Sequence, residues 1–173
     1  MVIRAAGPTD AETVAALNLA CWRETYAGLV PEETMAEMTL EERLDHWRGA
    51  FAAERTHVLL ASDAGAAAGF AAWRAHELAL GGRLGRGAEI SAIYLLRTAQ
   101  RRGLGRALMR AMALEMREAG LKWASLTVLG GNLPARRFYE ALGGRRFGRE
   151  THWRGAPQLA YGWRDLARLC AHQ

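Results

Sequence analysis

The sequence predicts an α/β fold in one domain, residues 1–173, in which helices cover both faces of a mixed β-sheet. An apolar strand at 89–96 passes through a glycine-containing turn into an amphipathic helix at 103–119, and a second apolar strand follows at 123–129. A helix that connects two strands in this way makes them parallel neighbours. The strands expected on either side of this unit come in pairs with short turns, which is typical of antiparallel hairpins. We therefore expect a predominantly antiparallel sheet of six to seven strands with one central parallel pair.

Local patterns define the remaining elements. The segment Thr9-Asp10-Ala11-Glu12 has the form of a capping box and begins a helix with Val14, Leu17 and Cys21 on its apolar face. The aromatic segment Trp22–Pro31 is expected to be a loop with its own helical turn. The other expected elements are a strand at 2–6, a helix at 40–53, a hairpin of 56–62 and 69–76 through Ala64-Gly65, an exposed turn at 80–87, a short helix at 132–142, and closing strands at 145–153 and 158–164.

The net charge of +5 is unevenly distributed along the chain. Residues 1–50 contain four arginines against nine acidic residues, whereas residues 101–173 contain fourteen Lys and Arg against five acidic residues. These basic residues are scattered over a turn, two helices and a hairpin without interleaved aromatics, so we expect no nucleic-acid partner. No apolar run approaches the roughly 20 residues that cross a bilayer, and the N-terminus has no signal-peptide pattern. The sequence therefore predicts a cytoplasmic protein without a membrane partner.

The turn before the helix at 103–119 has the features of an anion site. It reads Gln100-Arg101-Arg102-Gly103-Leu104-Gly105, and Arg106 follows. The first N–H groups of a helix have no intrahelical acceptor, and the positive end of the helix dipole favours an anion beside them. Gly103 and Gly105 would let a ligand lie against bare backbone, while the arginines add charged donors. We predict that this turn binds a pyrophosphate.

Other kinds of ligand site fit poorly. The dinucleotide fingerprint requires Gly or Ala three positions after its second glycine, where this chain has Leu108, and no Gly-x-x-x-x-Gly-Lys run occurs. The five histidines show no metal-ligand spacing, and no Cys-x-x-Cys occurs, so no metal is expected. No serine nucleophile elbow is present either, which favours direct attack without a covalent enzyme intermediate.

Two motifs resemble those of the GCN5-related N-acetyltransferase (GNAT) superfamily. Gln100–Gly105 is similar to its Gln/Arg-x-x-Gly-x-Gly/Ala pyrophosphate motif, and Asn132–Gly143 is similar to its later Asn-x-x-Ala-x-x-Phe-Tyr-Glu-x-x-Gly helix. The segments Trp22–Pro31 and Tyr161–Asp165 resemble a bacterial branch of the same superfamily. The resemblance implies a GNAT-like fold, in which the strands at 89–96 and 123–129 splay apart to admit the pantetheine arm of acetyl-CoA.

The resemblance also implies which residues bind acetyl-CoA. The end of the first splayed strand would hydrogen-bond pantetheine as an added strand would, and the glycine turn would hold the pyrophosphate. Asn132 would serve both as a pantetheine neighbour and as the N-cap of its helix. Arg136 and Arg137 are either 3′-phosphate contacts or solvated side chains. The expected cofactor residues are Tyr94, Leu95, Leu96, Gln100, Arg101, Arg102, Gly103, Leu104, Gly105, Arg106, Asn132, Ala135 and Tyr139.

Two residues are candidates for catalysis. Tyr139 lies beside the expected core stripe Ala135, Phe138 and Leu142, and the resemblance makes it the general acid for the leaving CoA thiolate; the alternatives are a core tyrosine or a water in its place. Glu89 opens a strand whose alternate members Ser91, Ile93 and Leu95 share one face. It stands eleven residues before Gln100, where histone-modifying relatives carry their base, although it could also be a solvated carboxylate.

The acceptor site in this family lies between the loop after the first helix, the strand at 69–76 and the closing hairpin. Aromatic and carboxylate side chains together suit an organic cation, although the aromatics could equally be core. The expected acceptor residues are Trp22, Glu24, Tyr26, Trp73, His152 and the neighbouring Trp153.

The resemblance and these residues together predict an enzyme. We expect an acetyl-CoA-dependent N-acetyltransferase, which acts on a primary amine of a small molecule or a peptide N-terminus and forms a homodimer. The alternative is an acyl-CoA-binding sensor with little catalysis.

Overall fold

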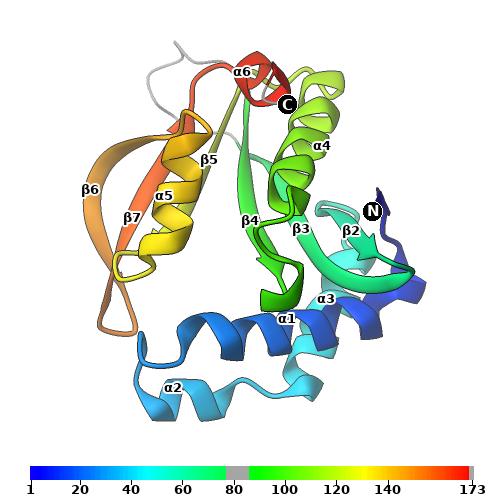
Figure 1. Ribbon diagram of the computed structural model, residues 1–173, viewed down its shortest axis with the longest axis vertical. Helices are drawn as coiled ribbons and strands as arrows, with labels where there is room; N and C mark the ends of the chain where they lie inside the picture. The colour runs from blue at the N-terminus through cyan, green and yellow to red at the C-terminus, as the bar shows by residue number, and fades with distance from the viewer. Residues whose placement is uncertain (77–85, 172–173) are drawn as a thin grey trace.

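The computed structural model describes residues 1–76 and 86–171, which form a seven-stranded sheet with helices on both faces (Figure 1). The strand order is β1-β2-β3-β4-β5-β7-β6, and each neighbouring pair is antiparallel except β4 and β5, which are parallel. This confirms the predicted fold class. The strands are β1 (Val2–Ala5), β2 (His57–Asp63), β3 (Ala66–His76), β4 (Gly87–Leu95), β5 (Trp123–Leu129), β6 (Arg145–Trp153) and β7 (Ala156–Trp163). The helices are α1 (Ala11–Tyr26), α2 (Glu32–Glu37), α3 (Leu40–Ala52), α4 (Leu104–Glu118), α5 (Leu133–Ala141) and α6 (Leu166–Ala171), with short 3₁₀ turns η1 (Pro8–Asp10) and η2 (Arg97–Ala99).

The two parallel strands part soon after they meet. β4 and β5 pair only over Gly87–Glu89 and Trp123–Ser125, at the start of both strands. Beyond Ser125, β5 stays in register with β7 as far as Leu129, while β4 stays with β3 as far as Leu95. The ribbons accordingly diverge towards the carboxyl ends of the two strands (Figure 1). The expected splay is therefore present, at the middle of the sheet.

A β-bulge bends β4 where it leaves β5. Ala72 is opposite Ala92 whereas Trp73 is opposite Ile90, so Ser91 is an extra residue in β4. A bulge of this kind bends the strand and strengthens its twist. It also resets the alternation of side chains, so the expectation that Glu89 shares a face with Ile93 and Leu95 is wrong.

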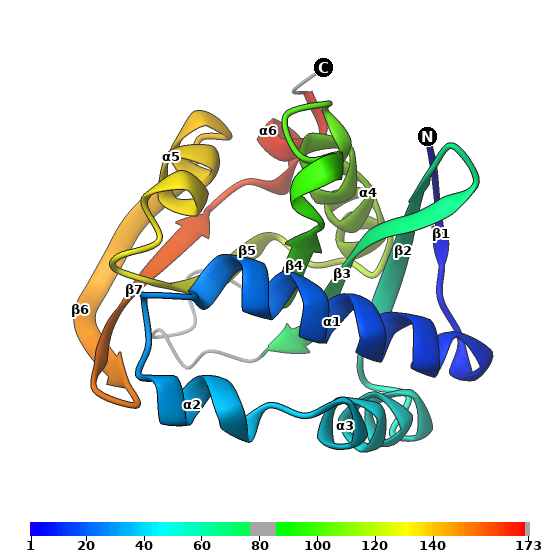
Figure 2. The same ribbon diagram turned by 60° about the horizontal axis from the view of Figure 1, so that its bottom comes forward.

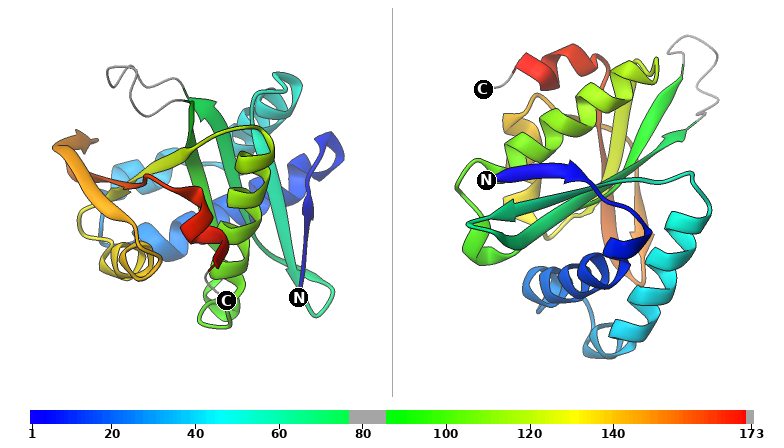
Figure 3. Two further views of the ribbon diagram at one scale, coloured as in Figure 1. Left: turned by 90° about the horizontal axis from the view of Figure 1, so that it is seen from above. Right: turned by 90° about the vertical axis from the view of Figure 1, so that its right-hand side faces the viewer.

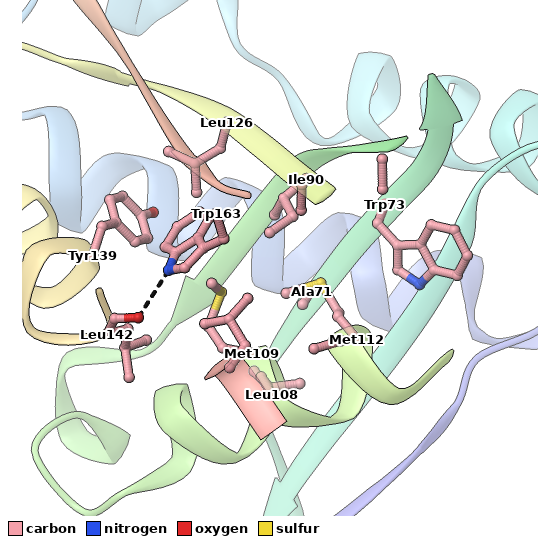
Figure 4. Packing of buried hydrophobic residues seen from close by; sticks show 14 of the residues in the cluster. Ala71, Trp73, Ile90, Leu108, Met109, Met112, Leu126, Tyr139, Leu142 and Trp163 are labelled. Carbon is pink, nitrogen blue, oxygen red and sulfur yellow. Dashed lines mark hydrogen bonds between the residues drawn. The ribbon is translucent and has the colours of Figure 1, made fainter. Parts of the chain in front are cut away.

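The helices divide between the faces of the sheet (Figure 3). The apolar sides of α1 and α3 pack on one face, in a cluster of Val14, Ala15, Leu17, Trp47, Val58, Leu60, Phe70 and Ala72. Helices α4, α5 and α6 pack on the other face, where Leu108, Met109, Met112, Leu142 and Leu166 belong to a larger cluster. Figure 4 shows this second layer, in which the Trp163 indole donates to the backbone oxygen of Leu142 at 2.9 Å. This arrangement leaves the gap between β4 and β5 with helices on both sides.

Most predicted turns and caps match the structure. Ala64 and Gly65 have φ angles of 49° and 83°, as a tight hairpin turn requires. The start of α1 differs, because Asp10, not Thr9, accepts a hydrogen bond from a backbone N–H, that of Gly7 at 3.0 Å. Asp10 also forms an ion pair with Arg4 at 2.6 Å. The turn expected at 80–87 lies largely outside the described residues.

Three helical segments were missed or shortened by the sequence prediction. Helix α1 continues through Trp22 to Tyr26, where a loop was expected, and helices α2 and α6 were not predicted. The aromatic side chains of this last part of α1 pack together, with the rings of Trp22 and Tyr26 5.3 Å apart between centroids. Burial of these rings stabilises helical structure in a segment that was expected to be a loop. Among the described residues, no helix is long and apolar enough to cross a membrane.

Candidate functional site

The free edge of β4 forms one wall of the gap. The N–H of Leu96 donates to Ala68 of β3 at 3.0 Å, so the backbone groups of Leu96 point away from β5. Because these groups alternate along a strand, the N–H and C=O of Leu95 and Ile93 point into the gap. The side-chain amide of Gln100 donates to the Leu95 oxygen at 3.0 Å. The edge thus offers strand-type hydrogen bonds at Leu95 and Ile93. The expectation that the backbone groups of Tyr94 and Leu96 do the same is wrong, because both residues direct these groups towards β3.

The N-terminus of α4 lies at the mouth of this gap. Gly103 is the N-cap with φ 85°, and Arg101 has φ 62°, so two left-handed residues turn the chain before the helix. The first helical bond of α4 runs from Ala107 to the Gly103 oxygen at 3.0 Å. The N–H groups of Leu104, Gly105 and Arg106 therefore have no acceptor within the helix. Successive backbone N–H groups in such a turn make a concave anion site.

Glycine is required at the two positions of the turn for different structural reasons. Gly103 needs its freedom to adopt a positive φ, and a Cβ there would meet nothing within 4 Å. A Cβ on Gly105 would lie 3.3 Å from Leu95 Cδ1 and from Phe138 Cζ. The absence of a side chain at Gly105 therefore lets α4, β4 and α5 approach one another, in addition to exposing backbone.

The arginines of the turn are not equivalent. The Arg102 guanidinium pairs with the Asp63 carboxylate at the end of β2, which draws it towards the β2–β3 hairpin. Arg101 is exposed and Arg106 is half-buried in the first turn of α4.

The two arginines of α5 also differ. Arg136 donates to the Gly130 oxygen at 2.9 Å and to the Tyr161 hydroxyl at 3.4 Å, so it holds α5 against the sheet. Arg137 is exposed.

Helix α5 begins and ends as the sequence predicts. Asn132 is its N-cap, and the Asn132 side-chain oxygen accepts from the Ala135 N–H at 3.2 Å. Gly143 follows the helix with φ 79°. The expected stripe of Ala135, Phe138 and Leu142 packs on the core, but Tyr139 is buried with it, at 6% exposed, and is more enclosed than Phe138 and Ala135.

Tyr139 is enclosed by aromatic rings of β7. Its ring centroid lies 6.0 Å from that of Trp163 and 6.2 Å from that of Tyr161. Burial raises the pKa of the Tyr139 phenol, and the neighbouring Tyr26 raises it further. Tyr139 is therefore a neutral hydroxyl over the whole physiological range.

Two more phenols, those of Tyr26 and Tyr94, pack together on the α1 side of the sheet. The hydroxyls of Tyr26 and Tyr94 lie 3.2 Å apart and share a hydrogen bond. Burial raises the pKa of both groups, and Tyr139 is among the groups that raise that of Tyr94. Tyr94 packs in the α1 cluster, whereas Tyr139 lies on α5 in the cluster on the other face of the sheet. All three hydroxyls are neutral at physiological pH.

Glu24 makes contacts that the sequence did not indicate. Its carboxylate accepts from the backbone N–H of Arg97 at 2.8 Å, and the Arg97 guanidinium donates to the Glu24 carbonyl at 2.5 Å. The nearby thiol of Cys21 is fully buried, and burial raises its pKa to about 12. Cys21 is therefore not a nucleophile in this structure.

Glu89 lies on the face of the sheet that α1 covers. Its neighbours Ala88 and Ile90 pack in the α4 cluster, so alternation points the Glu89 side chain the other way, towards the side of Tyr26. The Arg74 guanidinium donates to the Glu89 carboxylate at 2.7 and 2.9 Å.

The structure brings only some of the expected acceptor residues together. Trp22 is buried against Val30 and Leu129, with Tyr26 and Trp153 packed on the same cluster. Figure 2 shows α2 beside the tip of the β6–β7 hairpin, where Arg154 pairs with Glu37. His152 is an exposed residue of β6.

Trp73 is not part of this group. It is 1% exposed, packs with the α4 cluster, and donates from Nε1 to the Glu115 carboxylate of α4 at 2.8 Å. The His57 ring stacks on it with 4.0 Å between centroids. Since side chains alternate along β3, Trp73 faces away from Tyr26, and the structure gives it a role in packing α4.

Most of the chain matches a known protein family. The model of the acetyltransferase (GNAT) family matches residues 17–144, which include the gap, the glycine turn and α5. The chain belongs to the GNAT family of acetyltransferases. This confirms the family indicated by the two sequence motifs.

Known relatives extend over nearly the whole chain. The uncharacterized N-acetyltransferase YuaI of Bacillus subtilis (strain 168) is 28% identical over 177 residues, which cover 98% of this chain and 96% of YuaI. The PaiA N-acetyltransferase of Thermoplasma acidophilum, solved in complex with coenzyme A, has a similar fold with a TM-score of 0.70 at 20% identity, covering 94% of this chain and 100% of that one. YncA of Salmonella typhimurium, a putative acetyltransferase solved with acetyl-CoA, has a similar fold with a TM-score of 0.69 at 19% identity, and the match covers 96% of this chain and 94% of YncA.

Two contacts near the candidate site could not be predicted from the sequence. The Tyr26–Tyr94 hydroxyl pair joins residues 68 positions apart, and the contact of Glu24 with Arg97 joins residues 73 apart. No local pattern encodes such pairs. The aromatic density of Trp22–Tyr26 was the available signal for the first; nothing in the sequence marked Arg97.

Proposed function

We propose that this GNAT protein transfers the acetyl group of acetyl-CoA to a primary amine by direct attack at the gap between β4 and β5. The observation that carries the proposal is the parting of the two parallel strands directly beside the unpaired N–H groups at the start of α4. A diphosphate fits those N–H groups, and an extended amide chain fits the free edge of β4. The complexes of PaiA with coenzyme A and of YncA with acetyl-CoA support the same ligand for this chain.

The reaction requires a neutral amine. The nitrogen lone pair attacks the thioester carbon, the carbon–sulfur bond breaks, the nitrogen loses a proton, and the sulfur leaves as a thiol. For an amine with a pKa near 10.4, deprotonation at pH 7 costs about 4 to 5 kcal/mol. Glu89 is the proposed proton acceptor, acting directly or through water, because it faces the same side of the sheet as Tyr26. Accepting a proton, whether directly or through water, would weaken its pairing with Arg74.

Tyr139 is proposed to assist departure of the sulfur. A phenol near pKa 10 is a weaker acid than a thiol near 8.5, and burial raises the pKa of Tyr139 further. Full proton transfer from Tyr139 to a thiolate is therefore unfavourable. A hydrogen bond from its hydroxyl to the developing negative charge on sulfur stabilises the transition state without that transfer.

The acceptor is proposed to enter on the α1 side, near Tyr26, Trp153 and the tip of the β6–β7 hairpin. Tyr26 and Trp153 pack on one cluster of aromatic and aliphatic side chains. Aromatic side chains suit a cationic amine, so a primary amine of a small molecule or a peptide N-terminus is the proposed acceptor. Trp22 and His152 remain proposed contacts of the acceptor.

A thiol-release screen tests the proposal. Acetyl-CoA is incubated with the protein and with separate panels of aliphatic amines, aminoglycosides, amino acids and short peptides, and free CoA is measured. We expect release that depends on one class of amine and forms the corresponding N-acetyl product. Tight binding of acetyl-CoA without release across all panels would contradict the proposal and favour a sensor.

A further inference from the structure

We infer that Glu24 is a positioning residue for acetyl-CoA, which holds the end of β4 from the last turn of α1 through Arg97. The inference rests on the proposed function, because it assigns a role in binding the proposed acetyl donor. It replaces the expectation that Glu24 binds the acceptor.

The contact between the two residues is reciprocal. The Glu24 carboxylate accepts from the backbone N–H of Arg97 at 2.8 Å, while the Arg97 guanidinium donates to the main-chain carbonyl of Glu24 at 2.5 Å. Each residue thus uses one side-chain group and one backbone group. A pair of this kind fixes the two backbones relative to each other, whereas an ion pair between side chains alone would not.

Both backbone groups would otherwise lack a partner within their own element. Arg97 is the first residue of η2, where N–H groups have no intrahelical acceptor. Glu24 lies in the last turn of α1, where carbonyls have no intrahelical donor and a cation is favoured by the helix dipole. These two hydrogen bonds, here called the Glu24–Arg97 clasp, give a partner to an unpaired N–H at the start of η2 and to an unpaired carbonyl at the end of α1.

The clasp lies beside the segment that is proposed to bind acetyl-CoA. Arg97 is two residues beyond Leu95, whose backbone groups point into the gap, and three residues before Gln100. The Gln100 side chain holds the Leu95 oxygen at 3.0 Å, and the Leu96 N–H is held by Ala68 of β3 at 3.0 Å. Glu24 supplies the contact from the α1 side. The strand end that would receive pantetheine is therefore fixed from three directions.

The same contact explains why Glu24 is a poor contact for an ammonium group. Its carboxylate already accepts a backbone hydrogen bond, and the Arg97 guanidinium lies against its own carbonyl. A second cation there would meet a positive neighbour. Removal of Glu24 should consequently weaken binding of acetyl-CoA and leave binding of the amine almost unchanged.

Four single variants test the inference. Glu24→Ala removes the carboxylate, Glu24→Gln keeps an oxygen that can accept from the Arg97 N–H, and Arg97→Ala keeps that N–H but removes the guanidinium. Glu12→Ala is the matched control, since Glu12 is an exposed residue of the same helix with only a 3.8 Å ion pair to Arg48. For each variant we measure the Kd of acetyl-CoA by calorimetry, the KM of both substrates, kcat, and Tm.

The expected pattern separates positioning from the alternatives. Glu24→Ala should raise the Kd and KM of acetyl-CoA by about 5- to 10-fold, the net contribution of one ordinary hydrogen bond because the effect reaches the cofactor indirectly, with the KM of the amine within about twofold. Glu24→Gln should recover most of that loss, Arg97→Ala should have a smaller effect, and Glu12→Ala should match the wild type. A raised KM for the amine alone would overturn the inference, and so would a lower Tm with an unchanged Kd for acetyl-CoA. If the wild type does not bind acetyl-CoA, the proposed function itself fails, which is a different result.

Discussion

Gly69 of β3 provides a sharp test of how closely the middle strands must approach. It lies opposite Leu95 at the end of β4, and a Cβ built on it would be 2.3 Å from the Tyr94 oxygen, 2.4 Å from Leu95 Cδ2 and 3.0 Å from Leu95 Cα. Two of these atoms belong to the backbone, so rotation of a side chain cannot relieve the overlap. Gly69→Ala must therefore push the end of β4 away from β3.

The expected loss of stability follows from the insertion of an extra methyl group into a well-packed interior. We expect Gly69→Ala to lower the free energy of unfolding by about 2 to 3 kcal/mol. For a domain of this size that corresponds to a fall in Tm of roughly 5 to 10 °C. Because Tyr94 and Leu95 border the gap, the same variant should also weaken binding of acetyl-CoA.

Gly49→Ala is a matched control with the opposite expected sign. Gly49 lies inside α3, and a Cβ there would meet nothing within 4 Å. Alanine favours helix over glycine by about 0.5 to 1 kcal/mol, so this variant should be slightly more stable than the wild type. Chemical denaturation of the three proteins gives the comparison. A Gly69→Ala protein as stable as Gly49→Ala would refute the close approach of β3 and β4.

Four further outcomes are expected. Tyr139→Phe should lower kcat by about 10- to 100-fold with little change in the Kd of acetyl-CoA; an equal loss in both would make Tyr139 a binding residue. Because burial raises the pKa of Tyr139, the pH dependence of kcat should show no descending limb from this group below about pH 10, and a limb near pH 8 would contradict its assignment. Glu89→Gln should shift the ascending limb of kcat/KM for a lysine-like amine to higher pH, whereas an identical profile would remove Glu89 as base. The Arg4 side chain, with the Gly7 N–H, lowers the pKa of Asp10 to about 2, so the stability that Asp10 contributes is present above about pH 4 and is lost as the pH falls towards 2. In denaturation experiments, Asp10→Asn should have a free energy of unfolding about 1 kcal/mol below that of the wild type at pH 6, and this difference should disappear near pH 2. A difference that stays constant with pH would contradict this linkage.

The conformation of the glycine turn and the start of α5 could be predicted from the sequence because their determinants are local. Gly103 adopts the left-handed conformation that only a few residues favour, and the N–H groups it leaves unpaired follow directly in the chain. Asn132 caps α5 through a residue three positions away. Short-range patterns of this kind survive folding because few distant contacts can override them.

The acceptor side depends on contacts between distant segments. Tyr139 is more buried than Phe138 because two aromatic rings of β7 surround it, and helical periodicity alone cannot report that. The bulge at Ser91 shifts the phase of β4 and moves Glu89 to the opposite face from Ile93. Trp73 looked like an aromatic lining residue, yet the phase of β3 places it under α4. A one-residue change of phase reverses the face of every later side chain, which is why these assignments needed the folded chain.

The central claim is that bare N–H groups at the start of α4 hold a diphosphate while the gap between β4 and β5 admits the thioester. A crystal structure of the protein with acetyl-CoA tests this most directly. We predict that the diphosphate will lie against the N–H groups of Leu104, Gly105 and Arg106, with pantetheine along the free edge of β4 and its sulfur near the Tyr139 hydroxyl. A complex in which the diphosphate binds elsewhere, with protein side chains filling the gap, would contradict the account.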